Sequence, residues 1–374
     1  MLEEYDVTVV GGGVAGSVAA RFSAKEGFKT LLIEKYKTPR NKPCSGIQFS
    51  YFEKLIGAKI PREKLCANEL TKVEMEAPSG KVMKGQMRML NFWRSTFDSW
   101  LNTLAVEAGA EFRDETSLAD LQKSGKGFAA KISRLNEHEE VKTRYFVGAD
   151  GMLSQTRRKL RPEDFERKTS GATVNYYFVG DAKLDPNTLY MFYQRKFSPL
   201  MFAWAYKKDD KWVIGTGANE NPLEYAERFF NYVREKYGLR GEIVEREGFS
   251  SNMKSNIHLG EGNLLMVGDA AGLVDLYRGM GMDNAALSGR LAVKAIVNAE
   301  EKGCAAIELY QRLMRGTVHK LEANARKQAN RYASNRMLEK SLSPANLMKG
   351  GLLMVMINGI NRVLPPEKMI LLPL

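Results

Sequence analysis

Tyr5-Asp-Val-Thr-Val-Val-Gly-Gly-Gly-Val-Ala-Gly16 is the stretch that decides the fold. Its apolar first half has the character of a short strand, and its glycines fit the pattern G-x-G-x-x-G where that strand turns into a helix. Gly11 permits the tight turn, Gly13 allows a pyrophosphate to approach the backbone, and Gly16 lets the helix pack closely on the strand. A helix of small residues follows, ends at Gly27 and leads to a second strand, Thr30-Leu-Leu-Ile.

The second strand runs into an acid, Glu34, which stands eighteen positions after Gly16. A carboxylate at this place accepts hydrogen bonds from a ribose 2′-OH, and it favours FAD or NAD over NADP. The helix N-terminus adds free N–H groups and a partial positive charge for the phosphates. Strand, glycines, helix, strand and acid in this order predict a dinucleotide site.

The overall composition sets limits on the class of protein. The chain has 374 residues, which predicts two or three structural parts, and its 44% hydrophobic content is ordinary for a globular protein. Three cysteines cannot form a disulfide framework and indicate a reducing compartment, so we expect a cytoplasmic location. The chain enters its first strand almost at once, which predicts no signal peptide, and it lacks an apolar stretch long enough to span a bilayer.

The order of elements predicts an α/β fold in which a Rossmann-like domain is interrupted. Aromatic-rich strands begin near Ala172, and a buried strand with a glycine turn, Leu264 to Gly272, returns late to the dinucleotide-type pattern. We therefore expect a discontinuous FAD-binding domain, a β-rich substrate domain and a helical C-terminal region. The corresponding ranges are 1–70, 91–170 and 262–300 for the first, 71–90 and 171–261 for the second, and 301–374 for the third.

The C-terminal region is basic and then apolar. Between Gln311 and Lys349 it carries nine Lys or Arg against two acids, within a chain of formal net charge +12. Residues 350–360 form an apolar run of eleven, too short to span a bilayer. Such a segment lies in a membrane interface or packs as a buried helix, and both alternatives stay open. Nucleic acid is not an expected partner, because the basic segment offers only Tyr332 for base stacking.

Three separated motifs resemble the glutathione-reductase-type FAD fold of the flavoprotein monooxygenase superfamily. They are the N-terminal fingerprint, Gly148-Ala-Asp-Gly151, and Gly268-Asp-Ala-Ala-Gly272. Within that superfamily, Lys42-Pro-Cys-Ser-Gly46 resembles the P-C-x-G loop of the geranylgeranyl reductase family, which includes archaeal enzymes that saturate prenyl chains of membrane lipids. Phe202-Ala-Trp-Ala-Tyr206, Lys208 and Gly215-Thr-Gly217 resemble that family's Y-x-W-x-F-P-K and G-x-G strand pair. The sequence departs from the family at Lys207 and at Asp275-Leu-Tyr-Arg-Gly279, where the family usually has Pro and Asn-Pro-x-x-Gly.

The resemblance implies a set of FAD contacts. Asp269 is expected at the ribityl or pyrophosphate region, and Gly281 and Met282 begin a helix whose N-terminus faces the flavin. The full expected set is Gly11, Gly13, Ala15, Gly16, Glu34, Lys35, Pro43, Cys44, Ser45, Arg94, Asp150, Gly268, Asp269, Gly279, Gly281 and Met282. For Arg94, a simple salt bridge at the start of its helix is the alternative. No metal site is expected.

The implied reaction is reduction of isolated carbon–carbon double bonds in a prenyl lipid or prenylquinone, by hydride from reduced flavin and a proton from the site. Cys44 is the expected catalytic residue, either as the proton donor or as part of the pocket wall, since a thiol is a weak acid with an intrinsic pKa of about 8.5. Tyr190, Phe192, Trp204 and Tyr206 are expected to line an apolar tunnel for the substrate, although a sheet packed on its own helices would use such residues too.

Two other functions share the flavin motifs. A monooxygenase or halogenase acting on an aromatic substrate does not account for the loop at Pro43 and Cys44, and an electron relay to quinone would yield no saturated product. No second G-x-G-x-x-G precedes a helix, so we expect electrons from transiently bound NAD(P)H or a ferredoxin-like protein. The C-terminal segment would place the protein peripherally on a membrane.

Overall fold

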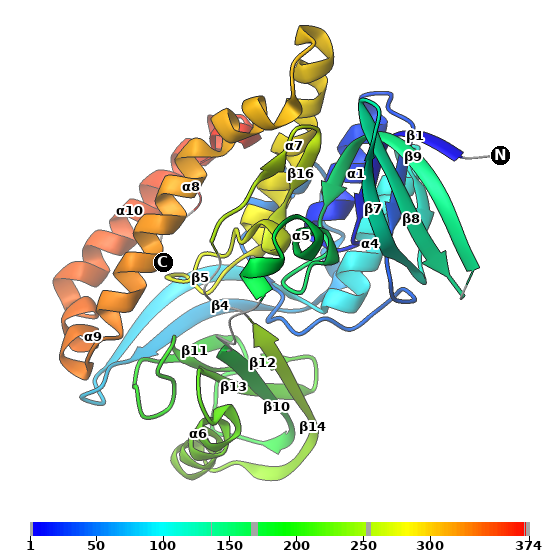
Figure 1. Ribbon diagram of the computed structural model, residues 1–374. Coiled ribbons are helices and arrows are strands. Elements are labelled where there is room, and N and C mark those ends of the chain that lie inside the picture. The colour runs from blue at the N-terminus through cyan, green and yellow to red at the C-terminus, as the bar shows by residue number, and fades with distance from the viewer. Residues whose placement is uncertain (1–2, 136, 166–170, 252–255, 370, 372–374) are drawn as a thin grey trace.

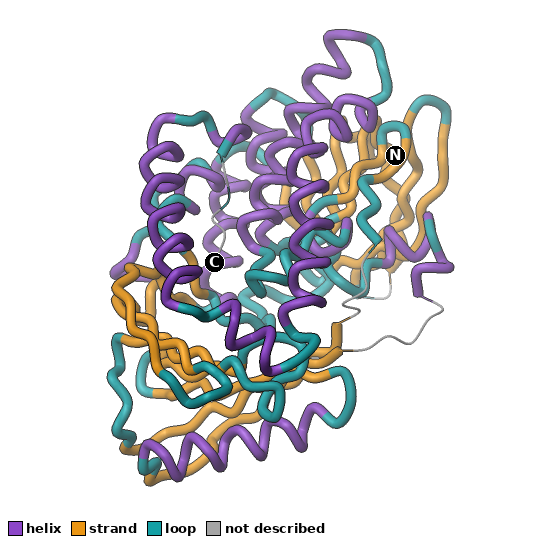
Figure 2. The backbone as a smooth tube through the Cα atoms, turned by 90° about the vertical axis from the view of Figure 1, so that its left-hand side faces the viewer, coloured by secondary structure: helices purple, strands orange, loops and turns teal. Residues whose placement is uncertain are grey.

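The computed structural model describes residues 3–135, 137–165, 171–251, 256–369 and 371. Within them the chain forms two large sheets, one above the other in Figure 1, with long C-terminal helices along one side. Figure 2 turns this side toward the viewer and shows helices over its upper part and strands below them. The predicted α/β class with an interrupted Rossmann-like domain is confirmed.

The first sheet carries the dinucleotide-type domain. Its order is β15-β16-β9-β1-β2-β6, and the strands from β16 to β6 are parallel. The bounds are β1 Glu3–Val10, β2 Thr30–Ile33, β6 Glu111–Arg113, β9 Glu137–Gly148, β15 Gly260–Glu261 and β16 Leu264–Met266, with β7 Thr116–Ser124 and β8 Gly127–Arg134 joined through β9. Val7, Val9 and Leu31 to Ile33 are fully buried. Parallel strands that are covered on both faces need such continuous apolar runs.

Helices of this domain pack on the sheet and on one another. They are α1 Val14–Lys25, α2 Phe52–Ile56, α3 Arg62–Leu65, α4 Arg94–Glu107, α5 Gln155–Leu160 and α7 Met282–Lys302, with short 3₁₀ turns η1 Pro162–Phe165 and η2 Gly268–Ala271. The helices α1 and α7 approach closely at Gly289 because glycine has no side chain; a Cβ there would collide with the backbone of Ala15. The last segment of the domain is thereby attached to the first.

The second sheet has the order β14-β10-β13-β12-β11-β4-β5-β3 and is covered on one face by α6 Pro222–Tyr237. Its strands are β3 Ile47–Gln48, β4 Cys66–Glu76, β5 Val82–Phe92, β10 Gly171–Asp181, β11 Thr188–Phe192, β12 Ala203–Lys208, β13 Lys211–Ala218 and β14 Arg240–Ser251. The sheet therefore takes in residues 66–70 and 91–92, outside the expected range 71–90, because β4 and β5 pair over almost their full length. Gly260–Glu261 belongs to the first sheet instead.

The C-terminal region is helical as expected, with α8 Ala306–Arg331, α9 Asn335–Ser341, α10 Pro344–Val363 and a final 3₁₀ turn, η3 Pro366–Lys368. Pro344 lies in the first turn of α10, where the N–H that proline lacks would have no partner within the helix. None of the helices in the described ranges combines the length and apolarity that crossing a bilayer demands.

Candidate active site

The three glycine motifs converge at one edge of the first sheet. Val10, Gly148 and Met266 end the neighbouring parallel strands β1, β9 and β16, so the segments that follow them meet. Gly11 has a φ of +108°, and a Cβ there would collide with the carbonyl of Ala149. A Cβ at Gly16 would collide with the carbonyl of Gly11. These contacts account for the first and third glycines of the fingerprint as packing requirements.

The N-terminus of α1 is open and suited to an anion. Gly13 is its N-cap, has no side-chain capping bond, and is followed by no acid in the first turn. Outside its chain neighbours and its own helix, a Cβ at Gly13 would meet only the guanidinium of Arg40 among the described residues, at 3.4 Å. Free N–H groups, the helix dipole and a nearby cation together fit a pyrophosphate group.

Glu34 is buried immediately after β2 and faces the glycine turn. Its carboxylate accepts hydrogen bonds from the N–H of Gly12 at 2.9 Å and of Tyr36 at 3.1 Å, and it forms an ion pair with Arg40 at 3.0 Å. A carboxylate accepts about four hydrogen bonds, so capacity remains for one ribose hydroxyl. Lys35, the next expected contact, is exposed and lies over the ring of Tyr36.

Asp150 and Arg94 are both bonded to side chains within the chain. The half-buried carboxylate of Asp150 accepts hydrogen bonds from Ser154 and Thr156 and so caps the start of α5, while desolvation raises its pKa. Arg94 forms two bonds to Asp98 at 2.7 and 2.8 Å, which is the salt bridge offered as its alternative role. Arg94 also lies beside Cys44. Burial lowers the pKa of the Arg94 guanidinium, but its interactions with Asp98 and Cys44 outweigh this effect, so the pKa of Arg94 is raised.

The residues around η2 and the start of α7 lie next to the Cys44 loop. Asp269 forms an ion pair with Lys42 at 3.3 Å, and a Cβ at Gly281 would lie 3.3 Å from its other oxygen. The sulfur atoms of Cys44 and Met282 are 3.8 Å apart. The loop 42–46 therefore borders both the third glycine motif and the first residue of α7, an arrangement that the sequence predicted only by resemblance.

Lys208 holds this loop from the second sheet. Its ammonium donates to the carbonyls of Ser45 at 2.5 Å and Phe92 at 3.3 Å, and the side chain is only 1% exposed. Burial lowers the pKa of Lys208 to about 8, against the opposing effect of Cys44. Lys208 belongs to the strand-pair motif of the family resemblance, but its local sequence does not indicate this contact with the Cys44 loop.

The structure divides the four aromatic residues expected to line one tunnel. Trp204 and Tyr206 lie with Tyr177 in one aromatic cluster, on the face of the sheet from which Lys208 reaches the Cys44 loop. Tyr190 and Phe192 pack on the opposite face with α6, in edge and tilted contacts with Phe229, Tyr232 and Tyr237. One tunnel wall cannot contain both pairs, so only Trp204 and Tyr206 remain substrate candidates.

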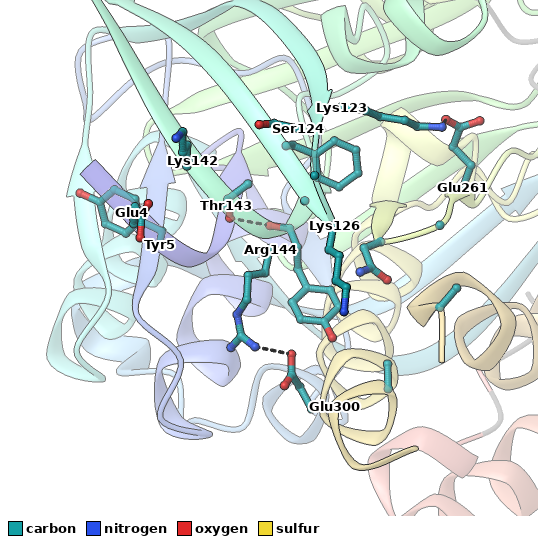
Figure 3. A pocket seen from close by; sticks show the side chains of 18 of the residues that line it. Glu4, Tyr5, Lys123, Ser124, Lys126, Lys142, Thr143, Arg144, Glu261 and Glu300 are labelled. Carbon is teal, nitrogen blue, oxygen red and sulfur yellow. Dashed lines mark hydrogen bonds and ion pairs between the residues drawn. The ribbon is translucent and has the colours of Figure 1, made fainter. Parts of the chain in front are cut away.

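A cavity of about 830 Å³ lies elsewhere, at the opposite end of β1, and is drawn in Figure 3. Glu4 and Tyr5 at the start of that strand line it, roughly 20 Å of extended chain before Gly11. Two ion pairs lie among its lining residues, Arg144 with Glu300 at 2.7 Å and Lys123 with Glu261 at 3.0 Å. It is not part of the cofactor site.

Comparison with known proteins identifies the fold and the family. The sequence profile described as "FAD binding domain" matches residues 4–312. The digeranylgeranylglycerophospholipid reductase of Thermoplasma acidophilum is 31% identical over 320 residues, 80% of each chain. The chain belongs to the geranylgeranyl reductase family. It is an FAD-dependent oxidoreductase, and the residues at the open N-terminus of α1 fit that cofactor.

Solved structures show the same fold. A geranylgeranyl bacteriochlorophyll reductase-like protein from Thermoplasma acidophilum superimposes with a TM-score of 0.80, at 24% identity and over 92% of each chain. The flavin-dependent halogenase CmlS has a TM-score of 0.71 at 17% identity, covering 94% of this chain and 70% of its own. At such identities the likeness shows the shared fold alone.

The departure from the geranylgeranyl reductase pattern at 275–279 creates a buried ionic cluster. Arg278 bonds Asp275 and Asp283 at 2.6 Å each, and all three are at most 2% exposed. Tyr51 donates to Asp283 at 3.1 Å, and Asn324 of α8 donates to Asp275 at 2.8 Å. The cluster ties the loop before α7 to α2 and α8, and no sequence signal would have predicted it.

Proposed function

We propose that this protein saturates carbon–carbon double bonds of a prenyl lipid of the geranylgeranyl type, or of a prenylquinone. The observation that carries the proposal is the position of Cys44, between the start of α7 and the aromatic face with Trp204 and Tyr206. A thiol thus stands where the cofactor-binding edge meets an apolar wall.

FAD, once bound and reduced, supplies the hydride. An isolated alkene offers no oxygen on which negative charge could be stabilised, so the chain must contribute position and a proton. The thiol of Cys44 gives its proton to the neighbouring carbon, which balances the hydride and leaves a thiolate. Arg94 faces that sulfur, and the charge of Lys208 acts on it. These two cations stabilise the thiolate until solvent returns a proton.

Each saturated bond consumes two electrons, which an external reductant must restore. NAD(P)H or a ferredoxin-like protein meets this requirement chemically. Either donor acts transiently, since the sequence carries one dinucleotide fingerprint.

The aromatic face orients a flexible apolar chain. Trp204 is held in place because its indole N–H donates to Asn175 at 2.9 Å, and Tyr206 is buried beside Tyr177. Fixed aromatic walls exclude water and limit the conformations of the prenyl chain, which brings a double bond to the reacting position.

An anaerobic assay tests the proposal. The purified holoenzyme is reduced, a geranylgeranyl phospholipid is added, and flavin absorbance and lipid mass are followed together. A gain of two hydrogens per double bond with matching reoxidation is the expected result. Rapid NAD(P)H-driven oxygen consumption with an aromatic compound and no saturated lipid would favour a hydroxylase, and reoxidation by quinone without a saturated product would favour electron relay.

A further inference from the structure

The outer face of α10 is apolar and exposed. Its side chains recur at helical spacing and fall on one stripe of the helix. Their exposed fractions are 76% for Met348, 64% for Leu352, 70% for Val355, 55% for Met356, 41% for Ile360 and 83% for Val363. We call this stripe the α10 outer face; no part of the chain within the described ranges covers it.

The opposite side of α10 is attached to the protein. Ile357 is 5% exposed and packs in the aromatic cluster with Phe49 and Tyr206. Lys54 of α2 donates to the backbone carbonyls of Asn361 and Leu364, the first at 2.9 Å. The helix is therefore held in place with its apolar stripe turned outward, rather than being free to roll it inward.

Basic side chains accompany this stripe. Lys349 lies on α10 itself, and the neighbouring helices α8 and α9, on the same side of the molecule in Figure 1, add exposed positive charge. The exposed basic residues of α8 and α9 are Arg312, Arg315, Arg326, Lys327, Arg336 and Lys340. An apolar stripe with Lys349 on its own helix and further exposed cations on the same side of the molecule matches an anionic bilayer, whose acyl region takes the stripe and whose headgroups take the charges.

We propose that the protein docks on an anionic lipid bilayer through the α10 outer face. A second copy of the chain suits this face less well, because a two-fold contact would bring the same basic residues of both copies together. Helices of the C-terminal region lie on the side turned toward the viewer in Figure 2.

The docked orientation gives a lipid a short path to the site. The two sides of α10 face the bilayer and the aromatic cluster around Tyr206, so one helix, about 10–12 Å thick, separates them. This part of the inference rests on the proposed function, because it takes a membrane lipid as the substrate. Docking itself requires no reaction and is tested separately.

Vesicle sedimentation of the full-length holoenzyme tests docking. The protein is mixed with phosphatidylcholine vesicles, with and without phosphatidylglycerol, and the pelleted fraction is measured. We expect binding that requires phosphatidylglycerol and weakens as salt is raised. The double substitution Leu352→Ser with Val355→Ser should lower the vesicle partition constant by roughly tenfold. Lys349→Gln should lower it about fivefold on the anionic vesicles.

The matched control is Leu223→Ser on α6, since Leu223 is also 64% exposed and lies on a different part of the molecule. It should bind vesicles as the unaltered protein does. All substitutions are at exposed sites, and unchanged melting temperatures would show that the variants fold.

Absence of vesicle binding would overturn the proposal, and so would binding that the double variant retains in full. Self-association that the double variant abolishes, without vesicle binding, would assign the face to a second copy. Reduction of a detergent-dispersed prenyl lipid keeps the two claims apart. A variant that saturates this lipid but no longer pellets has lost docking alone, whereas a protein that pellets but never saturates it contradicts the proposed function alone.

Discussion

Cys44 is the side chain on which the proposed chemistry depends at the residue scale. Of the three cysteines, it alone lies beside the start of α7, with the charges of Arg94 and Lys208 acting on it. Cys66 and Cys304 are half-buried and have no such surroundings in the described structure. Of the three, Cys44 is therefore the cysteine that we propose as the proton donor.

We expect Cys44→Ala to lower the rate of double-bond saturation by roughly 10²–10⁴, because a positioned general acid contributes a factor of this size. FAD content and reduction by dithionite should stay unchanged, since no backbone group is altered. Cys66→Ala is the matched control and should retain nearly full activity. A Cys44 variant within a few-fold of the parent rate would reduce Cys44 to a wall residue.

Lys208 predicts a change of stability with pH. Its pKa is about 8 in the folded chain and 10.5 when unperturbed, so the unfolded state binds more protons between these values. The free energy of unfolding should therefore rise as pH increases from about 8 to 10.5, by roughly 3 kcal/mol in total from this group. Below pH 8, Lys208 is protonated in both the folded and the unfolded state, so its contribution to the free energy of unfolding does not change with pH.

Denaturant unfolding at several pH values measures this effect. Lys208→Met should remove the rise, whereas Lys207→Met, at the adjacent position, should keep it. The Lys208 variant should also raise the KM for the lipid and slow turnover, because the Ser45 carbonyl loses its donor and the Cys44 loop is less firmly positioned. Equal pH curves for both variants would show that Lys208 titrates normally.

Pairing of β12 with β13 determines the aromatic wall at the element scale. Trp204 lies opposite Gly215, where a Cβ would come 2.5 Å from the indole nitrogen. Gly215→Ala should displace the indole, break its bond to Asn175 and destabilise the fold by about 1–3 kcal/mol, with a shift in tryptophan fluorescence. Gly217→Ala is the control, since its nearest atoms are 3.5 Å away. Indistinguishable spectra and stabilities for the two variants would contradict this explanation of the motif.

The loop before α7 depends on its buried ion cluster. Arg278→Met leaves Asp275 and Asp283 without their shared cation, which should cost about 3–5 kcal/mol. Arg290→Met, within α7 and with a half-buried side chain, should cost much less. Thermal unfolding compares the two, and adding Asp283→Asn to Arg278→Met should recover part of the loss. Equal losses for the two single variants would show that the cluster is not a special constraint.

Local patterns predicted most of the elements because each depends on neighbours in sequence. The helix from Pro222 to Tyr237 shows such local signals, with proline in its first turn and Gly238 in the left-handed conformation after its end. The fingerprint placed β1, α1 and β2 correctly for the same reason. Family membership was also within reach of short motifs.

Contacts between distant segments were not predictable in this way. Period-two alternation shows that Tyr190 and Phe192 point to the same face of the sheet, and that Trp204 and Tyr206 point to the same face as each other. It does not show whether these two faces are the same one. The strand register settles this, because Tyr190 pairs with Ala205 and points to the same face as Ala205, whereas Trp204 and Tyr206 on either side of Ala205 point to the other face. The bond between Tyr51 and Asp283 spans 232 positions and leaves no local signal.

The whole molecule combines three parts that the proposed function uses differently. The first sheet presents the cofactor-binding edge, the second sheet supplies the aromatic wall and Lys208, and the C-terminal helices close one side with α10 (Figure 1). Cys44 lies where the first two parts meet. The departure at Arg278 joins this junction to α8 through Asn324, so all three parts contribute to the geometry of one site.

Anaerobic turnover of the reduced holoenzyme with a geranylgeranyl phospholipid tests the central claim most directly. Flavin reoxidation and lipid mass are recorded in the same sample, with the Cys44→Ala variant in parallel. We predict reoxidation in step with a gain of two hydrogens per double bond, and a much slower gain in the variant. An unchanged lipid mass across several prenyl lipids and a prenylquinone, with rapid turnover on oxygen and an aromatic compound, would contradict the assignment as a prenyl reductase.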